Sequence, residues 1–198
     1  MYPWDDSNFK GLAWVKSKIY DDLYKYIQDS HRYQKFMPNK NIISLCKKVF
    51  NILYELQANT ENIKWLVISS DSFYLIKHCA NIIPIVYALT EKKYSIKMSN
   101  FDLLPLFKLT NTEEVSLLNR IKNYSMFVWD NFLVSPRGMN YYSGNIMDML
   151  TQRIDNEKIT MITSPFVGSD QEFFMQITEI WGKQVFSLLR ENSIFRFF

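Results

Sequence analysis

Glycine is scarce in this sequence, and it is missing from the longest stretch of the chain. The 198 residues contain five glycines, at positions 11, 138, 144, 168 and 182, where average usage of about 7% would give roughly 14. Residues 12–137 contain none. Phosphate-binding loops such as GxGxxG and GxxxxGK[ST] need glycine, because their backbone approaches the phosphate closely and adopts positive φ. The first two-thirds of the chain therefore cannot carry such a loop.

Composition and charge exclude several other classes of protein. Hydrophobic residues make up 47% and charged residues 22%, as in an ordinary globular domain. The net charge of +3 is too small to argue for nucleic-acid binding by itself. With two cysteines and two histidines, we expect no disulfide framework, no metal site and a reducing, cytoplasmic location. Residues 80–89, the longest nearly apolar run, have half the length of a membrane span, and residues 1–10 lack a signal-peptide core, so we expect no membrane association.

Short apolar runs alternate with helical patterns from residue 41 onward. Apolar side chains recur at helical spacing over residues 41–57, and further helices are predicted at about 73–90, 112–122, 143–156 and 170–190. Between them lie strand candidates at 65–69, 94–98, 126–130, 159–163 and 193–198. This alternation is typical of a parallel sheet covered on both faces. We therefore predict an α/β fold with three layers and a five-stranded parallel sheet.

Two prolines mark expected breaks in this pattern. Residues 1–40 are predicted to form a separate helical extension that ends where Met37 precedes Pro38, because the residue before proline disfavours the helical conformation. The core then spans residues 41–198. Pro84 falls within the helix at 73–90, where an interior proline costs about 3 kcal/mol. With Asn81 as N-cap, Pro84 would lie in a first turn, so we expect the helix to start or restart there.

The order of these elements resembles the core of the AAA+ P-loop ATPases, and more narrowly that of bacterial replicative helicase loaders and the transposition ATPases of insertion elements. YSMFVWDNF (124–132) is similar to the Walker B strand of that family, and ITMITSPF (159–166) is similar to its sensor-1 strand. GKQVFSLLREN (182–192) resembles the closing segment, which contains Leu-Gly-Glu-Arg and Ser-Arg-Leu. LIKHCA (75–80) aligns with Gly-Lys-Thr-His-Leu-Ala, of which His78 and Ala80 are retained. The resemblance covers about residues 41–198.

The residues that would bind and hydrolyse ATP in that family are replaced in this sequence. The resemblance places Ile76 at the phosphate-binding lysine and Lys77 at the Ser/Thr that holds Mg²⁺. The Walker-B-like strand keeps Asp130, whereas Asn131 stands at the second acid. Pro165 stands at the sensor-1 asparagine and Leu188 at the arginine of Ser-Arg-Leu. The resemblance therefore implies a pseudo-ATPase, for which we expect neither ATP nor Mg²⁺ binding. Since the chain stops at the strand 193–198, we also expect no C-terminal lid domain.

By this resemblance, the protein would act without catalysis in the DNA replication of a bacterium, phage or mobile element. It would bind the replicative helicase or its loader, as an accessory subunit or an inhibitor, in a hetero-oligomer rather than a homo-oligomer. An unrelated α/β interaction protein remains an alternative.

Two further alternatives depend on particular side chains. Arg137 with Tyr141 and Tyr142 could form a stacking platform for single-stranded DNA, and Lys183 and Arg190 are further candidate contacts to nucleic acid or a partner. An atypical nucleotide site would use Lys77 and Asp130. Each feature also has a structural interpretation: the tyrosines could anchor their loop, Lys77 could be a solvated helix residue, and Asp130 could cap the next turn.

Overall fold

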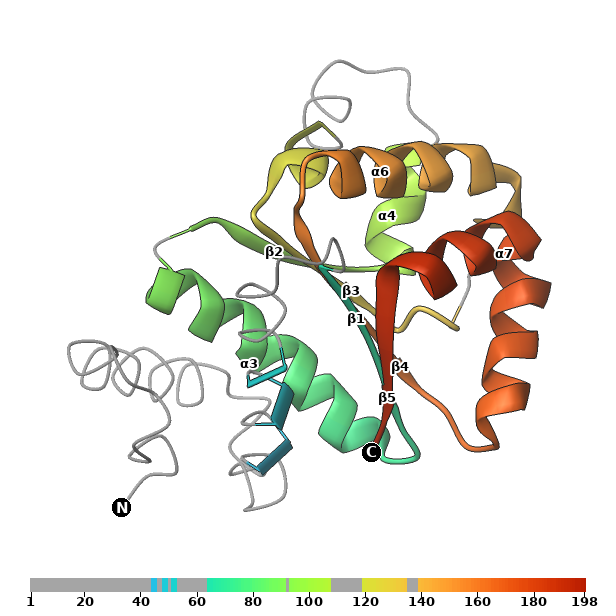
Figure 1. Ribbon diagram of the computed structural model, residues 1–198, viewed down its shortest axis with the longest axis horizontal. Coiled ribbons are helices and arrows are strands. Elements are labelled where there is room, and N and C mark those ends of the chain that lie inside the picture. The colour runs from blue at the N-terminus through green and yellow to red at the C-terminus, as the bar shows by residue number, and fades with distance from the viewer. Residues whose placement is uncertain are drawn as a thin grey trace.

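Five parallel strands form one sheet in the order β2-β3-β4-β1-β5 (Figure 1). The computed structural model describes residues 44–45, 48–49, 51–52, 64–91, 93–107, 119–134 and 139–198. All five predicted strands are confirmed to within two residues, and their bounds are β1 Trp65–Ser70, β2 Ser95–Ser99, β3 Met126–Asp130, β4 Ile159–Pro165 and β5 Ser193–Phe197. Every residue of β1 and β3 is buried, as continuous apolar runs in a doubly covered parallel sheet require.

Helices cover both faces of the sheet and complete the three predicted layers (Figure 1). Helix α3 (Phe73–Glu91) packs on one face together with the helical residues Leu45 and Val49. The other face is covered by α4 (Asn100–Phe107), α6 (Ser143–Asp155) and α7 (Asp170–Asn192). A short 3₁₀ helix, η2 (Met139–Tyr142), precedes α6. The two hydrophobic clusters on either side of the sheet form the core.

Both proline-containing helices differ from the sequence prediction. Helix α3 runs through Pro84 without a restart, so the assignment of Asn81 as an N-cap is wrong. Burial of Ile82 and Ile83 on either side of the lost hydrogen bond offsets the cost of the proline. Helix α4 was not predicted. Its first turn is capped by Asp102, whose carboxylate accepts the Ser99 backbone N–H at 2.8 Å and the Ser99 hydroxyl at 2.7 Å.

Helix α7 contains a kink at Gly182, where φ is 85° and ψ is 163°. This backbone conformation is open almost only to glycine. The helix begins with a capping box in which Ser169 and Glu172 satisfy each other's backbone N–H groups. Because of the kink, the second half of α7 turns to lie beside α6 (Figure 1).

Several predictions concern segments outside the described residues. They are the helical extension 1–40, Arg137, and the start of the helix at 112–122, of which residues 119–122 are described and are helical.

Candidate functional site

The carboxyl edge of the sheet is where the ends of β1, β3 and β4 meet, and it contains most of the residues that the sequence singles out. Strand β1 ends at Ser70 and α3 begins at Phe73, so only Asp71 and Ser72 connect them. A GxxxxGK[ST] loop needs several residues at this position to surround a phosphate with backbone amides. A two-residue connection has no room for a loop of that kind.

The backbone amides at the start of α3 are bound within the connection itself. The Ser72 N–H donates to the Ser70 hydroxyl at 3.2 Å, and the Leu75 N–H donates to the Ser72 hydroxyl at 3.3 Å. The Ile76 N–H donates to the Ser72 carbonyl at 3.2 Å. Hydroxyl groups of this chain thus take the donors that a phosphate would use at a helix N-terminus.

The side chains of Ile76 and Lys77 point to different surroundings. Ile76 is fully buried in the hydrophobic cluster between α3 and the sheet. Lys77 is half-buried, and its Nζ lies 5.6 Å from the ring centroid of Phe73, a cation–π contact with a side chain that is 51% exposed. The neighbouring His78 is buried beside Tyr74, and burial, together with the charge of Lys77, lowers the pKa of His78.

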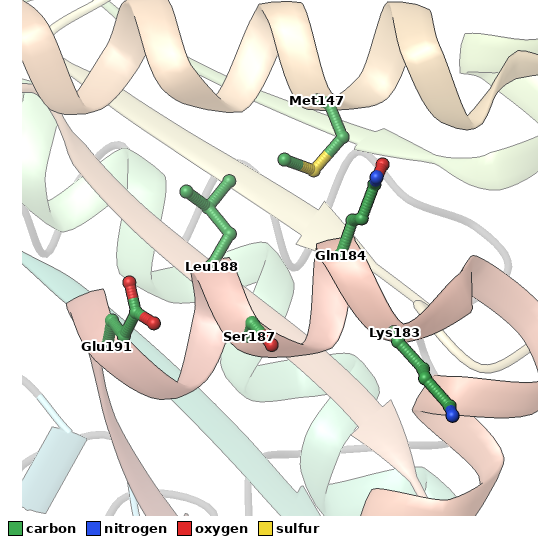
Figure 2. A pocket seen from close by; sticks show the side chains of 6 residues that line it. All are labelled: Met147, Lys183, Gln184, Ser187, Leu188 and Glu191. Atoms are coloured by element: carbon green, nitrogen blue, oxygen red, sulfur yellow. The ribbon is translucent and has the colours of Figure 1, made fainter.

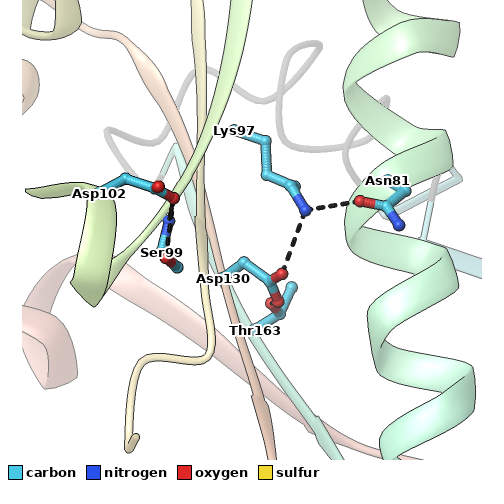
Figure 3. Close-up of polar contacts among 6 residues, drawn as sticks. All are labelled: Asn81, Lys97, Ser99, Asp102, Asp130 and Thr163. Carbon is cyan, nitrogen blue, oxygen red and sulfur yellow. Dashed lines mark hydrogen bonds and ion pairs between the residues drawn. The ribbon is translucent and has the colours of Figure 1, made fainter. Parts of the chain in front are cut away.

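Asp130 lies at the centre of a buried polar cluster formed by three strands and α3 (Figure 3). One carboxylate oxygen accepts the Thr163 hydroxyl from β4 at 2.8 Å. The other lies 3.3 Å from Nζ of Lys97 on β2, and the same Nζ donates to Oδ1 of Asn81 on α3 at 2.6 Å. The side chain of Asp130 is 5% exposed and that of Lys97 is 33% exposed. The carboxylate is thus bound to both neighbouring strands rather than serving as a cap for the turn.

The Lys97–Asp130 pair determines what this cluster can do chemically. A carboxylate with an ammonium partner and a hydroxyl donor is satisfied, and a buried ion pair is retained where its remaining hydrogen bonds are made. Mg²⁺ is usually held by one or two carboxylates together with substrate phosphates. Within the described parts of the chain, no group of three or more His, Cys, Asp or Glu side chains could hold a metal ion.

The two other substituted positions at this edge have roles in the backbone. Asn131 follows Asp130 with φ of 56°, a left-handed conformation that asparagine tolerates better than most residues. Its carbonyl accepts the Val134 N–H at 2.9 Å and the Asn100 side-chain amide at 3.2 Å. Pro165 ends β4 beside Ser70 of β1, and the next residue, Phe166, donates its N–H to the Ser70 carbonyl at 2.9 Å.

Leu188, Lys183 and Arg190 lie away from this cluster, on the second half of α7. Leu188 is partly buried against the core, and with Lys183 it lines a hollow of about 360 Å³ between α6 and α7 (Figure 2). Lys183 and Arg190 are both exposed. The structure therefore brings Lys183 and Leu188 together at one surface.

The two tyrosines of the proposed stacking platform differ in exposure. Tyr141 in η2 is 86% exposed, whereas the ring of Tyr142 stacks on Phe107 of α4 with centroids 6.2 Å apart. Tyr142 thus anchors η2 to α4, and Tyr141 is free of such packing in the described structure.

Sequence reasoning missed the polar partners of the site. Lys97 lies within a predicted strand and comes next to Asp130 only through the pairing of β2 with β3, in which Ser99 is opposite Asp130. Asn100 holds the turn after β3: its side-chain amide donates to the carbonyls of residues 131, 132 and 134, and its Oδ1 accepts the Trp129 indole N–H at 2.5 Å. The motif Ser99-x-x-Asp102, a helix-start pattern, was the available signal for α4.

This all-parallel sheet, with its strand order and its helices on both faces, has the AAA+ fold of replication initiators and helicase loaders. The structure of the DnaC helicase loader is similar with a TM-score of 0.62 and 16% sequence identity, over 83% of this chain and 94% of that chain. The replication initiator DnaA, bound to AMPPCP and single-stranded DNA, matches with a TM-score of 0.57 and 13% identity, over 80% of this chain and 46% of that chain. DnaI matches with a TM-score of 0.52 and 16% identity, over 82% and 91% of the two chains.

The sequence comparisons give no closer assignment. No family model matches the chain, and no curated protein matches it. No helix in the described residues is long and apolar enough to cross a membrane.

Proposed function

We propose that this protein is a pseudo-ATPase of DNA replication, which binds the replicative helicase or its loader as an accessory subunit or an inhibitor. The observation that carries the proposal is the carboxyl edge of the sheet. There, two residues connect β1 to α3, and Lys97 of the same chain pairs with Asp130. This edge does not fit a nucleotide triphosphate with Mg²⁺. We propose accordingly that neither is bound.

The chemistry of phosphoryl transfer supports this proposal. Catalysis in P-loop ATPases depends on positioning the phosphates, on Mg²⁺ and on an arginine that stabilises the transferred charge. Such an arginine contributes about 10³–10⁵ in rate, and Leu188 stands at its position in the resemblance. Lys97 already supplies a positive charge beside Asp130 at 3.3 Å, in place of a cation brought by a nucleotide.

The fold supports a role in replication, and an inactive subunit suits binding rather than turnover. A subunit that keeps the α/β core keeps its surfaces for assembly while it contributes no hydrolysis. In a hetero-oligomer it would occupy the place of an active subunit and leave its neighbour without an arginine. Replication in a bacterium, a phage or a mobile element would provide such partners, and it takes place in the cytoplasm.

An ATPase assay paired with calorimetry tests the catalytic half of the proposal. Purified full-length protein and its Asp130→Asn variant should both release phosphate from ATP at the background rate, and titration with ATP and Mg²⁺ should give no heat of binding. Hydrolysis by the wild type that disappears in Asp130→Asn would overturn the proposal. Tight ATP binding that is lost in Lys77→Ala would also do so and would favour the atypical nucleotide site.

A pull-down from the native host tests the partner. The tagged full-length protein should capture the replicative helicase or its loader, and adding the purified protein to the loading reaction should then raise or lower helicase loading. Capture of neither protein would refute the replication partner. A raised rate would identify an accessory subunit, and a lowered rate would identify an inhibitor.

Binding of single-stranded DNA is a second candidate function, favoured by the 86% exposure of Tyr141. An exposed aromatic ring can stack on any base, typically for about 1–3 kcal/mol. A mobility shift that weakens with salt and is lost in Tyr141→Ala would support this function. Tyr94→Ala is the matched control, because Tyr94 is 81% exposed at the opposite edge of the sheet, where β2 begins.

A further inference from the structure

The second half of α7 presents a stripe of polar side chains that are spaced one turn apart. Lys183, Ser187 and Glu191 are separated by four residues each and are all exposed (Figure 2). Residues at this spacing share one side of a helix. The stripe therefore has a positive end, a small residue in the middle and a negative end, over about 12 Å of helix at a rise of 1.5 Å per residue.

This stripe is complementary to itself when the helix is reversed. If two copies of the helix cross antiparallel at Ser187, Lys183 of each copy faces Glu191 of the other. Gln184 and Arg190 are also equidistant from Ser187, so the guanidinium of Arg190 faces the amide oxygen of Gln184 in the other copy. We propose that the second half of α7 is the contact surface of a symmetric homodimer, with Ser187 at the twofold axis.

The surroundings of the stripe suit a helix of a second copy. Figure 2 shows Gln184 and Leu188 pointing toward α6, from which Met147 points back. These side chains, together with the stripe, line the hollow of about 360 Å³. Two helices can approach to about 8–10 Å depending on the side chains at the crossing, and a serine there permits the short end of this range. A helix docked at Ser187 would cover the apolar side chains of Leu188 and Met147.

The charges favour a second copy over nucleic acid at this surface. A phosphate backbone would meet Lys183 and Arg190 but would be repelled by Glu191, which lies on the same side of the helix. In the antiparallel pair both charges of the stripe meet an opposite charge, and twofold symmetry makes each contact twice. This self-association is separate from the binding of a replication protein proposed above.

Charge reversal within one chain tests the dimer. Lys183→Glu places two acids opposite each other, and Glu191→Lys places two lysines opposite each other. The double variant Lys183→Glu/Glu191→Lys restores both pairs with reversed sign. Sedimentation at low salt should show a concentration-dependent dimer for the full-length wild type. Each single variant should raise the dissociation constant about tenfold or more, since two exposed ion pairs become two repulsions.

The double variant should return to within about threefold of the wild-type dissociation constant, and an equal mixture of the two single variants should form a heterodimer. Asp71→Lys is the matched control: it makes the same charge change as Glu191→Lys at the exposed β1–α3 connection, and it should leave the dimer unchanged. Ser187→Trp should abolish the dimer by blocking the close approach, with an unchanged circular dichroism spectrum.

Three results would overturn the inference. They are a wild type that stays monomeric up to about millimolar concentration, the range of the weakest specific contacts, a dimer unaffected by either single reversal, and a double variant as weak as the singles. A monomeric wild type would leave the proposed replication function in place, because the pull-down tests a different surface.

Discussion

Replacing Lys97 with methionine should destabilise the fold by leaving Asp130 charged and buried. The methionine keeps the length and apolar stem of the lysine, so the change removes the ammonium with little change in packing. The carboxylate, whose side chain is 5% exposed, would retain the Thr163 hydroxyl at 2.8 Å as its partner. Asn81 would lose the donor that now lies 2.6 Å from its Oδ1.

The size of the effect follows from the burial of the pair. Removing one partner of a fully buried ion pair costs about 3–5 kcal/mol. Because the Lys97 side chain is 33% exposed and water screens part of the interaction, we expect a loss of about 2 kcal/mol. For a chain of this size, that loss lowers the melting temperature by about 4–8 °C. Asp130→Asn should cost less, because an unpaired Lys97 can reach water.

Urea unfolding followed by tryptophan fluorescence measures these differences, since Trp129 is buried next to Asp130. The double variant Lys97→Met/Asp130→Asn should recover most of the loss, because it contains neither charge. Lys122→Met is the control: it breaks the 2.6 Å bridge to Asp148, whose side chain is 56% exposed, and should cost about 1 kcal/mol or less. The reasoning is refuted if Lys97→Met is no worse than the control, or if Asp130→Asn fails to rescue it.

Three further stability measurements test other parts of the structure. Arg153→Met should cost about 3 kcal/mol or more, because the carbonyls of residues 121, 124 and 159 lose a buried donor; wild-type stability would contradict this. Gly182→Ala should cost about 1–3 kcal/mol at φ of 85°, whereas Gly144→Ala, with open space around it, should be neutral or stabilising. Burial lowers the pKa of His78 below 6.5, so the neutral form is favoured in the fold and stability should fall as pH drops below about 6.5. His78→Gln should remove that part of the pH dependence, and an unchanged slope would count against it.

The strands could be predicted closely because their signal is local. Each consists of four or five consecutive apolar residues between polar turns, and a doubly covered sheet buries both faces of such a run. Helix α4 was missed because it has eight residues with Pro105 inside, which weakens the local helical pattern. Its stability comes from Leu103, Leu106 and Phe107, which are buried against the sheet and η2.

The candidate site could be predicted only in part. The glycine-free stretch predicts that no phosphate-binding loop follows β1, and the two-residue connection there is consistent with this. The position of Asp130 at a strand end was also evident. Its partners were not, because Lys97, Thr163 and Asn81 are 33, 33 and 49 residues away from it. Only the pairing of β2 with β3 and of β3 with β4 brings these side chains to one carboxylate.

The sequence by itself determined the order of strands and helices and the absence of the glycines that a phosphate-binding loop needs. Both depend on the conformational preferences and burial of neighbouring residues, which act over a few positions along the chain. The tertiary structure alone decided that Pro84 stays inside a helix, that Gly182 turns α7 toward α6, and that a lysine neutralises Asp130. These outcomes depend on contacts between distant segments, whose burial energy exceeds the local preferences that oppose them.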